Sequence, residues 1–164
     1  MSQPVPPPSG NPFANGGAPE PYPMAPPPAP VRDNVGLGLL AALVAAILAG
    51  VVYGAVMGGI EREIGWAAVG VGFLTGLAAG KVGGRNPVLP IASAVVSLGA
   101  VYLGQLIGIA IMAGKELHIS ASDLFFQEFG LVTEAWNEGK DPLTFLFFAL
   151  AAFAAFSGAK KASA

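Results

Sequence analysis

The residues best able to do chemistry gather in one short polar stretch: His118, Ser120, Ser122 and Asp123. These residue types could supply a nucleophile, a base and an orienting carboxylate, but a catalytic triad is defined by its geometry and not by closeness in sequence. The two serines also suit the start of a helix, because their hydroxyl groups accept hydrogen bonds from first-turn backbone N–H groups. The acidic residues nearby lack the spacing of a calcium-binding loop. We therefore predict no catalytic residues and no metal site.

Other kinds of chemistry are limited by residues that the chain lacks. It has no cysteine, which excludes disulfides, thiolate metal sites and a cysteine nucleophile. It has one histidine, so a two-histidine metal motif cannot form within one chain. Gly80-Lys81 resembles part of a phosphate-binding loop, but Thr75 stands where that motif has glycine and Val82 where it has serine or threonine. We predict that the protein is not an enzyme and holds no cofactor.

The composition indicates a membrane protein. Of the 164 residues, 54% are hydrophobic and only 11% are charged, whereas soluble domains carry about 25% charged residues. The formal net charge of -2 provides no basic surface for nucleic acid. We therefore expect the lipid bilayer, rather than nucleic acid or water, to cover most of the apolar surface.

Four uncharged runs can cross a bilayer: 36–60, 64–80, 88–114 and 142–158. A helical span needs roughly 17–25 apolar residues, so the second run is close to the minimum. Helices are expected because backbone groups in lipid must be paired within the protein. The predicted fold is all-α, with residues 35–164 forming a four-helix transmembrane bundle.

The first 34 residues form a separate zone. Twelve of the fifteen prolines precede Val31. Proline fixes φ and removes a backbone donor, and the apolar residues here are too sparse to build a core. We predict a disordered, proline-rich tail over residues 1–34.

The distribution of cations predicts which ends face the cytoplasm. The positive-inside rule places the larger share of lysine and arginine on the cytoplasmic side. With both termini inside, five of the eight cations are cytoplasmic: Arg32, Lys81, Arg85, Lys160 and Lys161. Arg62, Lys115 and Lys140 are then outside. We predict a multi-pass protein of the inner membrane with cytoplasmic N- and C-termini.

Small residues four apart predict close packing between the spans, because apolar lipid leaves van der Waals contact as the main attraction between helices. The first two spans are joined by a short turn, so we expect an antiparallel hairpin with their glycine ridges facing each other. A seam between two copies of the chain is the alternative. The packing glycines are Gly50, Gly54 and Gly58 in the first span, Gly72, Gly76 and Gly80 in the second, and Gly104 and Gly108 in the third.

Two further features concern polar positions. Gln105 is the strongly polar side chain predicted to lie deep within a span, where it would donate a hydrogen bond to a neighbouring helix or, in an oligomer, line a pore. Residues 120–138 carry apolar side chains at helical spacing, which predicts a short amphipathic helix in the third loop. Gly130 favours a split or a bend within it. Its aromatic side would rest on lipid, on the bundle or on a partner.

The block Ile64 to Leu77, which follows Glu61-Arg62-Glu63, resembles a hairpin of small uncharacterised bacterial multi-pass membrane proteins. The proline-rich tail is similar to tails that precede the first span in such proteins. The resemblance implies no activity, and the membrane glutamate of small multidrug exporters is missing. We predict a structural or interaction component that acts through helix packing and contacts with another copy or another membrane protein. A small oligomeric channel or carrier is the alternative.

Overall fold

The computed structural model describes residues 33–163, which contain six helices and no strand; Asp33 and Gly84 form an isolated β-bridge. The predicted disordered tail falls almost wholly outside the described residues. The helices are α1 (Val35–Ile60), α2 (Gly65–Gly83), α3 (Val88–Leu117), α4 (Ala121–Gln127), α5 (Phe129–Gly139) and α6 (Pro142–Ala162).

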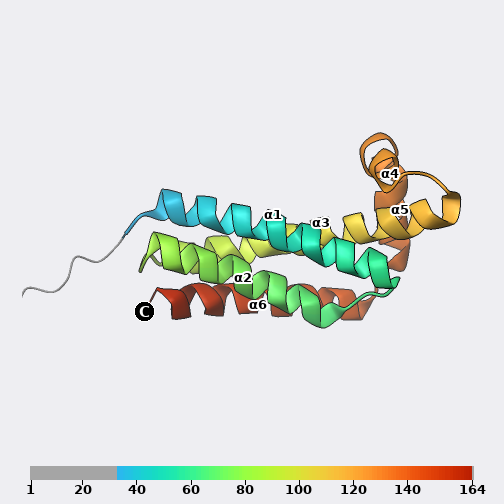
Figure 1. The fold of residues 1–164 in the computed structure, drawn as a ribbon. Coiled ribbons are helices and arrows are strands. Elements are labelled where there is room, and N and C mark those ends of the chain that lie inside the picture. The colour runs from blue at the N-terminus through green and yellow to red at the C-terminus, as the bar shows by residue number, and fades with distance from the viewer. Residues whose placement is uncertain (1–32, 164) are drawn as a thin grey trace, which may run out of the picture. The chain divides into compact units, whose positions relative to one another are not determined.

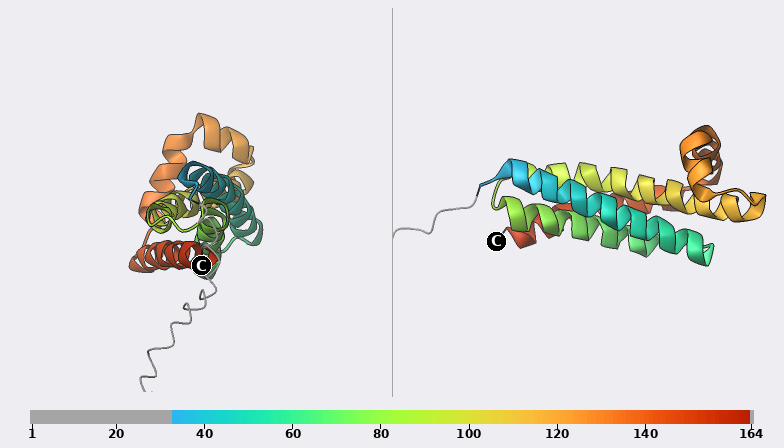
Figure 2. Two further views of the ribbon diagram at one scale, coloured as in Figure 1. Left: turned by 90° about the vertical axis from the view of Figure 1, so that its left-hand side faces the viewer. Right: turned by 45° about the horizontal axis from the view of Figure 1, so that its top comes forward.

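Four of these helices, α1, α2, α3 and α6, are long and apolar enough to cross a membrane. They run side by side, while α4 and α5 lie together at one end of the bundle (Figure 1). Figure 2 shows the same arrangement from two further directions. We call α4 and α5 the cap, and the end that carries them the capped end. The prediction of an all-α fold with four helices long and apolar enough to cross a membrane is confirmed for the described residues.

Three of the long helices continue past the uncharged runs that predict them. Lys81 lies in the last turn of α2, Lys115 in that of α3, and Lys160 and Lys161 in that of α6. A lysine can remain helical here because its long side chain reaches the headgroup region and its charge is favoured near a helix C-terminus. Hydropathy therefore marks the part of each helix in hydrocarbon, and not its full length.

The predicted amphipathic segment over residues 120–138 forms two helices. They meet at Glu128, whose φ of -118° and ψ of 38° are not helical, two residues before the glycine expected to split or bend the segment. The break lets both short helices pack against α3: Leu124 of α4 and Val132 of α5 are buried in one cluster with Leu106 and Ala110. Burial of both side chains explains why the cap is not one straight helix.

The α1–α3 contact depends on glycine. Added Cβ atoms at Gly50 and Gly54 would meet the carbonyl groups of Ala100 and Gly104, respectively. A Cβ added on the α3 side would also collide with α1, because at Gly104 it would meet the ring of Tyr53. The backbones of α1 and α3 are therefore too close to admit even a methyl group along this seam.

The α2–α6 contact follows the same rule. Added Cβ atoms on three glycines of α2 would meet the carbonyl groups of three alanines of α6 that are spaced four residues apart. The pairs are Gly72 with Ala151, Gly76 with Ala155, and Gly80 with Ala159. The expectation that the α1 and α2 ridges face each other is therefore wrong. Gly50, Gly54 and Gly58 pack on α3, and Gly72, Gly76 and Gly80 pack on α6. The start of α1 does meet its hairpin neighbour closely, where Gly38 lies against Gly83.

We expect Gly76→Ala to destabilise the protein and Gly70→Ala to be tolerated. The first methyl group collides with the Ala155 carbonyl, whereas nothing lies within 4 Å of a Cβ at Gly70. Overpacking of this kind costs about 1–3 kcal/mol. Thermal unfolding of both variants in mild detergent measures the difference, and equal stability of the two would contradict the seam.

Candidate functional site

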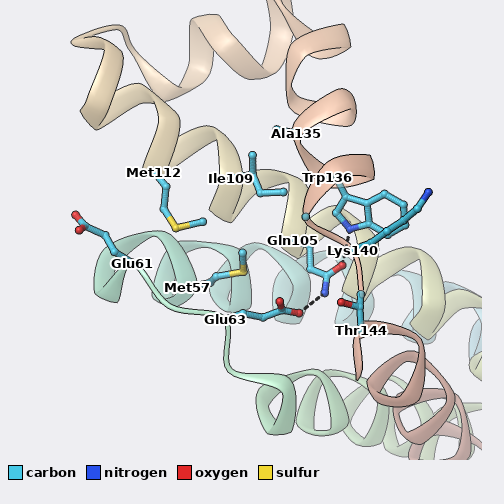
Figure 3. Close-up of a pocket in the computed structure, with 11 residues that line it drawn as sticks. Met57, Glu61, Glu63, Gln105, Ile109, Met112, Ala135, Trp136, Lys140 and Thr144 are labelled. Carbon is cyan, nitrogen blue, oxygen red and sulfur yellow. Dashed lines mark hydrogen bonds between the residues drawn. The ribbon is translucent and has the colours of Figure 1, made fainter. Parts of the chain in front are cut away.

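A cavity of about 270 Å³ lies at the capped end, between the bundle and the cap (Figure 3). A larger groove of about 610 Å³ between α1 and α2 has almost entirely apolar walls, as expected of a surface that contacts lipid chains. The cavity differs because it combines apolar walls with carboxylate, amide, indole and ammonium groups. It is lined by Met57, Glu61, Glu63, Gln105, Ile109, Met112, Ala135, Trp136, Gly139, Lys140 and Thr144.

Gln105 of α3 joins two distant segments at this cavity. Its Nε2 donates a 2.8 Å hydrogen bond to Oε1 of Glu63 in the α1–α2 turn. Its Oε1 accepts a 2.7 Å hydrogen bond from Nε1 of Trp136 in α5. An indole N–H can only donate, so these two partners fix which way the amide points. Gln105 is 3% exposed, and its two bonds link the turn to the cap through α3.

The structure places Gln105 near one end of the bundle. Its partner Glu63 immediately precedes the N-cap of α2, and Thr144 in the first turn of α6 lines the same cavity. Gln105 therefore lies level with the starts of α2 and α6, whereas the ends of α1 and α3 reach further. Its hydrogen-bond partners are therefore a turn and the cap rather than a neighbouring long helix.

Glu63 lines the cavity without an ion-pair partner among residues 33–163. The residue is exposed, but its carboxylate points to Gln105 (Figure 3). Burial raises the pKa of Glu63 above its usual range, the Gln105 amide opposes this change, and the nearby Asp141 carboxylate adds to it. Among residues 33–163 the ion pair formed is Lys115 with Glu61, at 3.1 Å, and it does not include Glu63.

Tyr53 adds an unpaired hydroxyl group next to this pair. The side chain is 3% exposed and packs against α3. Its hydroxyl lies near Gln105 and Glu63, yet it has no hydrogen-bond partner among the described residues. A buried hydroxyl without a partner is costly, so this atom calls for an explanation.

Aromatic packing holds the indole of Trp136 in place. Tyr102 of α3 meets it edge to face at 4.9 Å, and Phe148 of α6 meets it at 6.4 Å. Lys140 lies over the ring, with Nζ 5.2 Å from its centroid, and donates a 2.6 Å hydrogen bond to Asn137 Oδ1. These contacts fix the N–H of Trp136 toward Gln105.

The start of α6 forms the floor of the cavity. Asp141 caps this helix by accepting hydrogen bonds from the N–H and hydroxyl of Thr144, at 2.7 and 2.9 Å. These bonds hold the pKa of the Asp141 carboxyl below its usual range. Pro142 occupies the first turn, where its missing N–H is not needed.

The polar residues that first attracted attention lie elsewhere. His118 ends α3 in a left-handed conformation. Ser120 and Ser122 share a 2.6 Å hydrogen bond, and Asp123 accepts one from Gln127 at 3.1 Å, so these groups do not form a triad. Within residues 33–163 no three His, Asp or Glu side chains are placed to hold a metal ion.

The sequence predicts that Gln105 has a polar partner, but it identifies neither partner. Glu63 and Trp136 lie 42 and 31 residues away in the chain. In the sequence Glu63 belongs to a charged turn, and Trp136 to the apolar positions of residues 120–138. The one available signal was the polarity of Gln105 itself, because a buried amide requires partners.

We expect Gln105→Leu to lower the free energy of unfolding by about 1–3 kcal/mol, because it leaves the Trp136 N–H and the Glu63 carboxylate without their buried partner. Gln127→Leu is the matched control, since it removes an exposed glutamine that bonds only to Asp123. Denaturant titration in mixed micelles compares the two. Equal losses would show that the Gln105 bonds contribute nothing beyond those of a surface amide.

In comparisons with protein-family models, curated proteins and solved structures, nothing matches this chain. The resemblance to small bacterial membrane proteins therefore stays a prediction. The function is argued below from the packing of the bundle and from the groups at its capped end.

Proposed function

We propose that this protein is a non-enzymatic interaction component of the inner membrane. In this proposal the four long helices are a rigid support, and the cap is the surface that meets another membrane protein. Both termini would lie in the cytoplasm and the cap outside.

The observation that carries the proposal is that the glycine seams are used within the chain. The packing glycines of α1 face α3, and those of α2 face α6. A seam between copies would need at least one of these ridges to be free. The bundle therefore completes its own packing, which leaves the cap as the part with unexplained apolar surface.

The cap has one anchored side and one free side. Leu124 and Val132 are buried against α3. Phe126 is 80% exposed, and Phe129 and Leu131 are also exposed. Aromatic residues on a supported, accessible surface are typical of the centre of protein interfaces. This arrangement favours a contact surface over a simple connecting loop.

The orientation rests on the charges at each end. Lys81, Arg85, Lys160 and Lys161 belong to the end opposite the cap, where α2 and α6 finish. Arg62, Lys115 and Lys140 belong to the capped end (Figure 1). The excess of cations at the uncapped end supports a cytoplasmic position for that end.

A small oligomeric channel or carrier is the competing proposal. The Glu63 carboxylate beside Gln105 favours it, because such groups often bind ions near a pore mouth. Against it, the interior between the four long helices is filled by an apolar cluster that includes Tyr53, Val71, Val101 and Ala151. This apolar packing opposes a polar path through one copy of the bundle.

Because the chain has no cysteine, single introduced cysteines can be labelled selectively. One such experiment tests whether the cap contacts another protein and on which side of the membrane it lies. A membrane-impermeant maleimide that carries a photo-crosslinker is applied to intact cells expressing Phe126→Cys, Asn137→Cys or Ser163→Cys. We expect labelling at positions 126 and 137 but not at 163, and a discrete protein adduct after illumination that is strongest from position 126. Labelling at 163 alone would invert the orientation. Lipid adducts alone from position 126 would contradict the interaction surface.

A further inference from the structure

Independently of the proposed partner contact, the cavity at the capped end has the features of a small-ligand site. We propose that it binds a primary ammonium group, with the Glu63 carboxylate as its counter-ion. The argument rests on the charges, the hydrogen-bonding groups and the walls of the cavity.

The cations near the cavity are already engaged. Lys115 donates to the Gly58 carbonyl at 3.0 Å and pairs with Glu61 at 3.1 Å. Lys140 donates to Asn137, and its ammonium lies over Trp136, well away from Glu63 (Figure 3). The Glu63 carboxylate therefore faces the cavity with an amide as its one hydrogen-bond partner among the described residues.

The acceptors around Glu63 suit the N–H donors of an ammonium group. The second Glu63 oxygen is free of hydrogen bonds among residues 33–163, and the Gln105 carbonyl oxygen keeps a second lone pair after accepting from Trp136. An ammonium group in the cavity would donate to these two acceptors and neutralise the carboxylate, while its remaining N–H faces the open side of the cavity.

The walls limit what the rest of the ligand can be. Met57, Ile109 and Met112 line the cavity with flexible apolar surface. The volume of about 270 Å³ is just under the range of about 300–1,000 Å³ typical of drug-sized ligands. A short carbon chain attached to the ammonium group fits this space better than a large ring system.

Two sources can supply this chemistry. One is a free alkylamine from the aqueous side, and the other is the headgroup of a primary-amine phospholipid, because the cavity lies level with the starts of α2 and α6. A quaternary ammonium group carries the same charge but has no N–H to donate. Comparing the binding of primary and quaternary ammonium groups therefore distinguishes recognition by hydrogen bonds from attraction by charge alone.

Trp136 lies in the cavity wall and provides the readout. The chain has two tryptophans, so Trp66→Phe leaves Trp136 as the single tryptophan in the full-length protein, and selective excitation of tryptophan reports on it alone. n-Butylammonium and tetramethylammonium are titrated against this protein in lipid-free detergent. In a second arm, native mass spectrometry counts bound phosphatidylethanolamine and phosphatidylcholine.

We expect saturable binding of n-butylammonium, of phosphatidylethanolamine, or of both, with the quaternary forms much weaker. Glu63→Gln should weaken binding roughly tenfold or more, the loss expected for a hydrogen bond to a charged group. Glutamine can still accept from Gln105, so this variant should fold, which its thermal unfolding checks. Glu138→Gln, an exposed change on α5 outside the cavity wall, should bind like the parent.

Each outcome bears on the proposal. Binding of the amine identifies an aqueous ligand, and binding of the lipid alone identifies a headgroup site. Failure of both primary amines to bind, equal binding of the quaternary forms, or full binding by Glu63→Gln would overturn it. None of these results depends on whether the cap contacts another protein, so the two proposals can fail separately.

Discussion

The structure depends on close approach between backbones, which glycine permits along two helix pairs. In a membrane, helices gain little from burying apolar surface against each other, so close contact has to supply the attraction. Gly54 against Gly104 and Gly76 against Ala155 remove the distance that side chains would impose. Without these contacts α1 would separate from α3 and α2 from α6, and four apolar helices would have no defined arrangement.

The polar groups at the capped end follow from these seams. Gly104 lets α1 approach α3 closely, and the next residue, Gln105, is thereby brought within reach of Glu63 in the turn that follows α1. The same amide receives the indole N–H of Trp136, which orders the cap on the bundle. One buried glutamine therefore connects membrane packing with the arrangement of the polar end, and it places a carboxylate beside a cavity.

Much of the fold is predictable from the sequence because its signals are local. Uncharged runs mark the four long helices, and small residues spaced four apart mark the faces that pack. Which helix each ridge packs against is not a local property. The sequence around Gly76 does not distinguish α1 from α6 as the helix that it contacts. The row of alanines on α6 decides it only when all helices are considered together. The break at Glu128 and the contacts of Gln105 with Glu63 and Trp136 depend on tertiary contacts in the same way.

The central claim is that the glycine ridges of α1 and α2 face different helices. Solid-state NMR on the unmodified protein in liposomes, with ¹³C in glycine and alanine, measures this directly through carbon–carbon contacts. The account predicts cross-peaks that join Gly76 to Ala155 and Gly54 to Gly104. A cross-peak joining Gly54 to Gly76, without those two, would show that the ridges of α1 and α2 face each other and would contradict the account.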